Sequence, residues 1–384
     1  MPLPDPTGPH RVGVIEADVP ARTDAGCVPV VVYYPAIDEP DAPPSTALCG
    51  ATSSEPEQLR WLDARYAAAL GKSHLTGTLG AWSAGALMGN LGPAATNYEV
   101  VRAAVGADAK PPPAGGWPVA VFSHSLTGWR HVNSSLCAEL ASHGAVVIHM
   151  EHADGTACLC TSSEDGRVLA EYVDWAREKT EELKQSTDDV GAALEAWRRA
   201  QVARRVVEIA AALDGLEKIC ARVHRGGAFA RTASNVAVMG QSFGGAAAVA
   251  CLRESRFSHC CIYDPWLDGV GPHRHPLPDA DYQGKFPRTL KRLALWSCGA
   301  SPLQESCGAN WDSILAKAGS VGVRHHEAEA GHFAQTDAPV VFEKGPLSSI
   351  YTALVSKADQ SSDSETLLRR CLEQTVAELS SLYA

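Results

Sequence analysis

The 384-residue sequence lacks the ligand spacings that usually mark a zinc site or a disulfide framework. It has 12 cysteines but no CxxC repeat, and the close spacing of Cys158-Leu-Cys160 and of the Cys260-Cys261 pair suits neither arrangement. The histidine groups 149–152 and 273–275 lack the helical HExxH spacing. We therefore expect no metal and no cofactor, and cysteines that fill the core as reduced thiols.

The N-terminal segment, MPLPDPTGPH, has no apolar run, and we therefore expect no secretory signal. Pro2 in place of glycine also excludes N-myristoylation. Positive charge is in the minority, with 33 Lys and Arg against 44 Asp and Glu, which gives a net charge of −11. These features predict a cytoplasmic protein that does not bind nucleic acid.

No charged residue occurs between Ser73 and Tyr98, yet the segment is too rich in glycine and small polar residues for a membrane span. Its apolar side chains leave two interpretations open. They pack in the core, which we favour, or they form a lipid-facing surface around Leu79, Trp82, Leu87 and Met88.

Short apolar runs bounded by Gly, Pro or polar residues predict buried strands. They lie at residues 29–34, 119–122, 145–149, 235–239, 260–263, 292–296 and 322–327. Apolar residues at helical spacing predict helices over 131–142 and 190–217. This alternation indicates an α/β fold, a mostly parallel central sheet with helices on both faces. We expect one domain, 1–384, with a surface excursion at 153–189 that carries a helix near 171–183, and a long loop at 265–287.

The strand at 235–239 leads into a G-x-S-x-G turn centred on Ser242 and then into an alanine-rich helix. This strand–turn–helix context is that of the nucleophile in the α/β-hydrolase fold. A Cβ at Gly240 or Gly244 would collide where strand and helix approach each other. We therefore predict that Ser242 is a catalytic nucleophile.

A serine nucleophile needs a base and an acid that orients the base, and in this fold the chain order is serine, acid, histidine. Asp264 ends the next predicted strand, and His332 follows Gly331 in the loop after the last one. We assign the acid to Asp264 and the base to His332. His325 and His326 fall inside the last strand, where one should face the core and the other should face outward.

The oxyanion of the tetrahedral intermediate needs two hydrogen-bond donors. The first is the backbone N–H of Phe243, directly after the nucleophile. The second should come from the loop 123–128, after an early central strand, where we expect the N–H of Leu126.

Beyond these motifs, the sequence resembles the plasma and intracellular type II platelet-activating factor acetylhydrolases. Segments that resemble this family, in order, are 8–13, 121–124, 137–144, 151–152, 236–245 and 335–337. The resemblance implies a serine esterase that cleaves the short sn-2 acyl (acetyl) ester of such phospholipids. We expect the reaction to pass through an acyl-enzyme and to be calcium-independent, because the backbone N–H groups stabilise the oxyanion. The resemblance also implies a phospholipid substrate. We further expect peripheral contact with a membrane or lipoprotein surface.

The resemblance places the family's catalytic residues on Ser242, Asp264 and His332, and its oxyanion N–H groups on Leu126 and Phe243. Ser125 and Pro265 depart from the family's small residues, and a strained backbone is expected at Ser125. Two alternatives stay open: a general carboxylesterase or polyester- or dienelactone-type hydrolase on the same fold, and an inactive lipid-binding protein.

Overall fold

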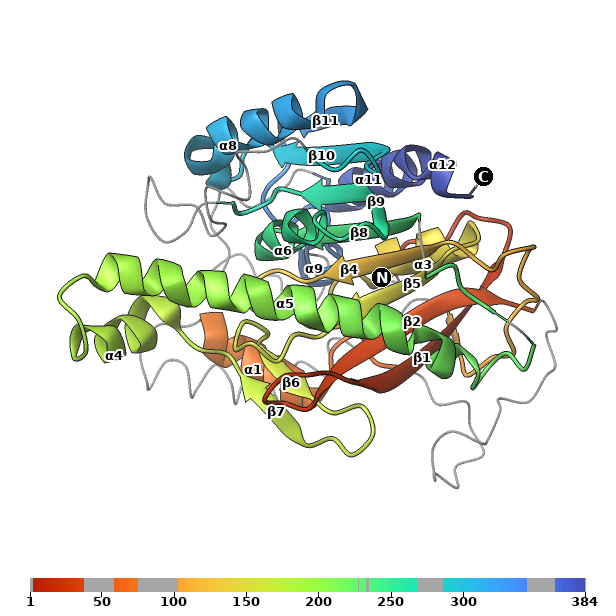
Figure 1. Ribbon diagram of the computed structural model, residues 1–384, viewed down its shortest axis with the longest axis horizontal. Coiled ribbons are helices and arrows are strands. Elements are labelled where there is room, and N and C mark those ends of the chain that lie inside the picture. Colours follow the sequence, from red (N-terminus) through yellow and green to blue (C-terminus); the bar gives the residue numbers. More distant parts are fainter. Residues whose placement is uncertain are drawn as a thin grey trace.

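The computed structural model describes residues 3–37, 59–74, 103–226, 228–232, 235–267, 286–343 and 363–383. Within them, a nine-stranded sheet of order β11-β10-β9-β8-β4-β5-β2-β1-β3 runs through the molecule (Figure 1). Its strands are β1 (Arg11–Pro20), β2 (Cys27–Ala36), β3 (Ala103–Val105), β4 (Val119–Ser123), β5 (Val146–Met150), β8 (Val236–Gln241), β9 (Phe257–Tyr263), β10 (Arg292–Cys298) and β11 (Gly322–Glu327). All seven predicted strands are present.

Strands β4, β5 and β8 to β11 pair in parallel, whereas β2 pairs antiparallel with β5 and with β1. The mostly parallel sheet is thus confirmed. Parallel neighbours need a crossover, and helices supply most of them. These helices are α3 (Ser134–Ser142), α5 (Val190–Cys220), α6 (Phe243–Cys251) and α8 (Leu303–Ala318). The sequence did not predict β1, because Glu16 and Asp18 interrupt its apolar run.

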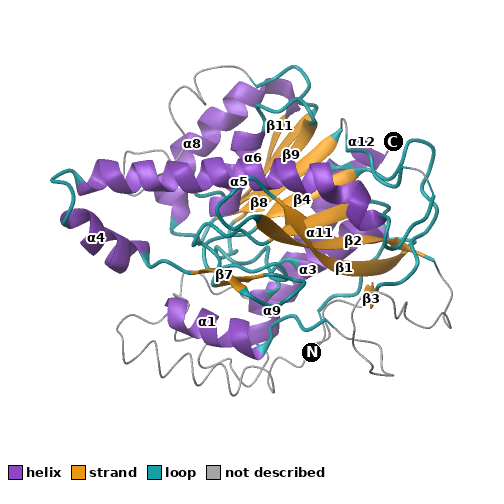
Figure 2. Cartoon of the chain, turned by 60° about the horizontal axis from the view of Figure 1, so that its bottom comes forward, coloured by secondary structure: helices purple, strands orange, loops and turns teal. Residues whose placement is uncertain are grey.

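Helices cover both faces of the sheet, as expected (Figures 1 and 2). Helices α5, α6 and α8 pack on one face, and α3, α9 (Ala338–Glu343) and α11 (Ser364–Glu378) pack on the other together with α1 (Ala64–His74). Strand β4 shows how the sheet divides the core, because Val119 and Val121 belong to one apolar cluster whereas Ala120 and Phe122 belong to the other.

In the expected surface excursion, 153–189, residues 163–189 are exposed or half-buried. Most of 153–162 is buried, and the segment forms a hairpin of β6 (Leu159–Thr161) and β7 (Val168–Glu171). The helix near 171–183 starts later than predicted, since Glu171 ends β7. Helical structure begins with a π-helix, Trp175–Lys179, and continues as α4 (Thr180–Lys184). Asp174 marks this start, because its carboxylate accepts hydrogen bonds from the N–H groups of Ala176 and Arg177.

All eleven cysteines in the described ranges are free thiols, and ten of them are buried. In the same ranges, no helix is long and apolar enough to cross a membrane. Most of the Ser73 to Tyr98 segment and of the loop 265–287 lies outside the described residues. The lipid-facing alternative and the histidine group at 273–275 therefore stay predictions.

Candidate active site

Ser242 lies in a sharp turn between β8 and α6, with φ 55° and ψ −119°. A non-glycine residue with this backbone is strained by roughly 1–3 kcal/mol, and such strain is concentrated at functional sites. A Cβ built on Gly240 would overlap the carbonyl oxygen of Gly244, and one built on Gly244 would overlap that of Ser123. The predicted reason for the two glycines is therefore correct.

Asp264 follows the last residue of β9, also at positive φ (40°), and its side chain is fully buried. One carboxylate oxygen accepts the backbone N–H of Cys298 at 3.0 Å. The other carboxylate oxygen accepts a hydrogen bond from the Ser301 hydroxyl. The same oxygen also lies 2.6 Å from Nδ1 of His332, within hydrogen-bond distance. These bonds fix the imidazole so that its Nε2 points away from Asp264.

His332 lies in the loop after β11, and hydrogen bonds join it to the residue before the serine and join the serine to the residue before Asp264. The side-chain amide of Gln241, the residue before Ser242, donates to the carbonyl of His332 at 2.9 Å. The N–H of Ser242 donates to the Tyr263 carbonyl at 2.9 Å, next to Asp264. The three residues singled out from the sequence therefore meet where β8, β9 and β11 end, because parallel strands bring their carboxyl ends to one edge of the sheet.

The two strand histidines lie apart from this constellation. His325 stacks on Trp296, with ring centroids 4.8 Å apart, and its Nε2 is 2.9 Å from Glu378. His326 is exposed, and its Nδ1 is 3.0 Å from the hydroxyl of Ser297.

The loop 123–128 packs directly against the serine turn, since Gly244 touches the backbone of Ser123. Strain in this loop falls on Thr127, at φ 57°, whereas Ser125 is not at positive φ. The strain expected at Ser125 is therefore absent. Phe243 begins α6, so that its N–H has no acceptor one turn earlier in the helix. The oxyanion roles of Leu126 and Phe243 stay predictions.

A buried arginine that the sequence did not single out supports this loop from α5. Arg205 is fully buried and donates from Nη1 to the Ser123 hydroxyl at 3.0 Å and to the His124 carbonyl at 2.6 Å. Its Nε donates to Asp154 at 2.8 Å, and its Nη2 donates to the hydroxyl of Thr156. The sequence indicated this role only through the position of Arg205, a charged residue on the side of the predicted helix 190–217 that faces the core.

One of the two histidines in the group 149–152 belongs to the same network. His152 Nε2 lies 2.9 Å from the Ser123 hydroxyl, and its Nδ1 lies 2.7 Å from Glu208. His149 stacks on Phe122, with centroids 5.1 Å apart. Burial raises the pKa of Glu208 to about 7 and holds the pKa of His152 well below its usual value.

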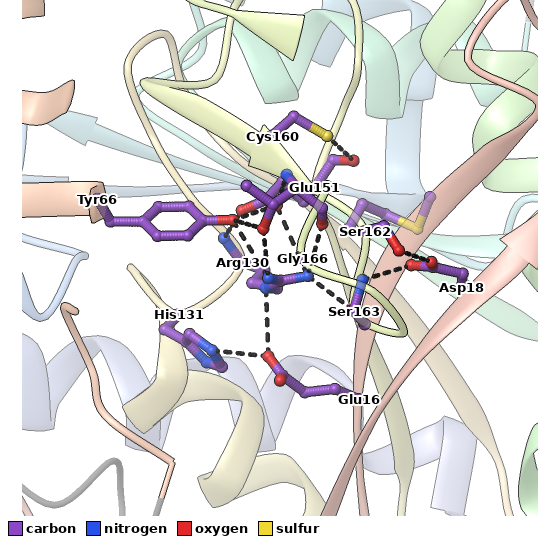
Figure 3. A network of polar contacts seen from close by, with 12 residues as sticks. Glu16, Asp18, Tyr66, Arg130, His131, Glu151, Cys160, Ser162, Ser163 and Gly166 are labelled. Atoms are coloured by element: carbon purple, nitrogen blue, oxygen red, sulfur yellow. Dashed lines mark hydrogen bonds and ion pairs between the residues drawn. The ribbon is translucent and has the colours of Figure 1, made fainter. Parts of the chain in front are cut away.

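A second buried network anchors the chain just after this loop (Figure 3). The Arg130 guanidinium lies 3.2 Å from Glu16 and 3.7 Å from Glu151, and it donates to the hydroxyl of Tyr66 at 3.2 Å. Burial would raise the pKa of Glu16, but Arg130 and His131 more than offset this and lower it to about 2. The network joins β1, α1 and the residue directly after β5 to the segment that follows the loop 123–128.

The sheet order and the strained serine turn define the fold as that of an α/β-hydrolase. Among solved structures, a ferulic acid esterase from Streptomyces cinnamoneus is similar, with a TM-score of 0.57 and 20% identity over 99% of this chain and 94% of that one. This likeness shows the fold alone.

The chain belongs to the family described as platelet-activating factor acetylhydrolase, isoform II, whose profile matches residues 2–277. The matched range includes Ser242 and Asp264 and ends before His332.

Two curated relatives are similar over shorter ranges. A platelet-activating factor acetylhydrolase of Cavia porcellus is 30% identical over 170 residues, which are 41% of this chain and 37% of the relative. A putative phospholipase A2 of Schizosaccharomyces pombe is 53% identical over 51 residues, which are 13% of this chain and 12% of the relative. The chain thus spans well under half the length of these two relatives.

Proposed function

We propose that this protein is a serine esterase that cleaves the short sn-2 acyl ester, acetyl above all, of phospholipids similar to platelet-activating factor. The observation that carries the proposal is the buried Asp264 carboxylate, 2.6 Å from Nδ1 of His332, at the strand ends where the strained Ser242 turn lies. Family membership supports the choice of lipid.

In the proposed reaction, Nε2 of His332 takes the proton of the Ser242 hydroxyl as Oγ attacks the sn-2 carbonyl carbon. Asp264 stabilises the imidazolium that forms, and the N–H groups of Leu126 and Phe243 hold the oxyanion. When the carbonyl reforms, the bond to the glycerol oxygen breaks, and the lyso-lipid leaves with the proton from His332. Water then attacks the acyl-enzyme with the same base, which releases the short acid and restores the serine.

The N–H groups supply the electrostatic stabilisation, so that the reaction needs no calcium and no cofactor. We further propose that the protein acts in the cytoplasm and reaches its phospholipid through peripheral contact with a membrane or lipoprotein surface.

A fluorophosphonate probe tests the nucleophile. The wild type should be labelled on Ser242, and Ser242→Ala should stay folded but lose both labelling and ester hydrolysis. Labelling that survives the substitution would refute the assignment. EDTA and added calcium should leave the rate unchanged.

A chain-length series tests the substrate against the alternative of a general carboxylesterase. Phospholipids with sn-2 chains from acetyl upward should be compared with p-nitrophenyl esters of the same acids. A short acyl pocket predicts a steep fall with length, because overpacking costs roughly 1–3 kcal/mol and displaces the carbonyl from its donors. Equal turnover of long chains contradicts the proposal, and activity on soluble esters alone favours the general esterase.

A further inference from the structure

Arg198 on α5 is a buried cation that has no anionic partner among the residues that the structure describes. Its side chain is 1% exposed, and within the described residues it makes no ion pair. Nη1 donates to the side-chain carbonyl of Gln201 at 2.8 Å, whereas Nε and Nη2 are buried and find no hydrogen-bond partner in the described part of the chain. Such orphaned donors are rare in folded proteins and require an explanation.

Four aromatic rings surround the guanidinium. Its Cζ lies 4.6 Å from the ring centroid of Trp197, 5.4 Å from those of Trp175 and Phe243, and 5.5 Å from that of Trp266. Cation–π contacts stabilise the charge in part. The rings cannot accept the in-plane N–H bonds of Nε and Nη2, which together form the edge that binds a carboxylate or phosphate in bidentate fashion.

The charge persists under working conditions. Burial lowers the pKa of Arg198 to about 10, which leaves the guanidinium protonated at neutral pH. The carboxylate of Asp154 acts on Arg198 through its electrostatic field. It makes a hydrogen bond and an ion pair with Arg205, whose Nε lies 2.8 Å from it. An anion at the free edge would therefore meet an unneutralised cation.

The cage adjoins the candidate catalytic residues. Phe243 directly follows Ser242, and Trp266 lies two residues after Asp264. The backbone N–H of Trp266 donates a hydrogen bond to the Ser242 carbonyl at 2.9 Å. Figure 1 shows that the end of α5 next to α4 projects beyond the sheet. A substrate bound at Ser242 would thus have the cage beside it.

We propose that the Nε and Nη2 edge of Arg198 binds an anionic group of the ester substrate, either the phosphate of the head group or a terminal carboxylate on the acyl chain. The inference rests on the proposed function and adds to it the group that selects esters carrying a phosphate or carboxylate over esters carrying neither. An anion reaches this edge when one ring of the cage moves aside. Trp175 is the ring best placed to move, because it lies on the short π-helix beside the exposed residues 176–178.

The test uses four lipids with one 1-alkylglycerol backbone. Two are 2-acetyl lipids, one with and one without a 3-phosphocholine group. The other two lack phosphate and carry a 2-glutaroyl or a 2-pentanoyl chain. The wild type is compared with Arg198→Met and with Arg198→Lys, which keeps the charge but not the bidentate edge of the guanidinium. The control is Arg199→Met on the exposed side of the same helix.

Arg198→Met should raise KM about 10- to 100-fold for the lipid with the recognised anion, the loss expected for a charge-assisted hydrogen-bond pair, and should leave its neutral counterpart within about twofold. Arg198→Lys should lie between, and Arg199→Met should match the wild type. Selective loss on the phosphocholine pair identifies the phosphate, and selective loss on the glutaroyl pair identifies the carboxylate. An equal change on all four lipids overturns the inference and shows a structural role.

A binding measurement separates this inference from the proposed function. Ser242→Ala protein is titrated with the same four lipids, and the fluorescence of the cage tryptophans is followed. Tighter binding of the lipid that carries the phosphate or carboxylate than of its counterpart without that group, lost in Ser242→Ala/Arg198→Met, supports the subsite whether or not the wild type turns the lipid over. Equal binding of both members of each pair overturns it. Absence of turnover by the wild type refutes only the esterase.

Discussion

Replacing Arg205 by methionine tests whether this residue, which does not touch the substrate, positions the loop 123–128 that is proposed to hold the oxyanion. The change removes the donors to the Ser123 hydroxyl and the His124 carbonyl and leaves the buried Asp154 without its cation. Breaking a buried pair in this way costs about 3–5 kcal/mol of unfolding free energy. Loss of one oxyanion donor lowers kcat by roughly 10²- to 10³-fold, and a displaced Leu126 N–H should cost up to that amount.

The assay combines urea unfolding with kcat and KM on a neutral acetyl ester, for which Arg198 has no anion to bind. Arg205→Met should lose stability and kcat with little change in KM. Adding Asp154→Asn should restore much of the stability, because the buried charge is gone, but should not restore kcat. Arg205→Lys keeps the charge and should recover stability more than activity.

Recovery of kcat together with stability in the double variant would refute the reasoning, because activity would then follow folding alone. An unchanged kcat in Arg205→Met would refute it as well. Asp154 supplies a further check, since burial raises its pKa but Arg205 and His152 together lower it well below its usual value. The stability that this pair contributes is therefore present above about pH 4 and is lost as pH falls further, and Arg205→Met should remove that loss.

Three further changes have defined outcomes. Gly244→Ala places a methyl group against the Ser123 carbonyl and should slow fluorophosphonate labelling and cost about 1–3 kcal/mol in urea unfolding; normal labelling would show that the turn and the loop can separate. Burial raises the pKa of Glu208 from 4.5 to about 7, so that wild-type stability should fall by on the order of 3 kcal/mol as pH rises between these values. Glu208→Gln should abolish this slope, and a persistent slope would assign it elsewhere. His332→Ala should lower kcat by orders of magnitude whereas His325→Ala should mainly lower Tm, and the reverse pattern would move the base to the strand.

The sequence alone determined the serine turn, because a strand, two glycines and a helix are contiguous in residues 235–251 and each follows from local sterics and periodicity. It also determined the class of sheet, since buried parallel strands appear as uniform apolar runs between amphipathic helices. Chain order then sufficed to select Asp264 and His332, which the structure brings within hydrogen-bond distance.

Only the tertiary structure decided what the arginines of α5 do. Helical periodicity predicts which side of the helix carries Arg198 and Arg205, but it does not identify the residues that they contact. Charged side chains are usually exposed, so the sequence gives no reason to expect these two in the core. Arg205 bonds Ser123 and His124 across 82 and 81 residues of sequence, and Arg198 meets Phe243 and Trp266 from other elements. Such contacts depend on how α5 packs against the sheet and α6, and no local pattern encodes that packing because its partners lie far apart in the chain.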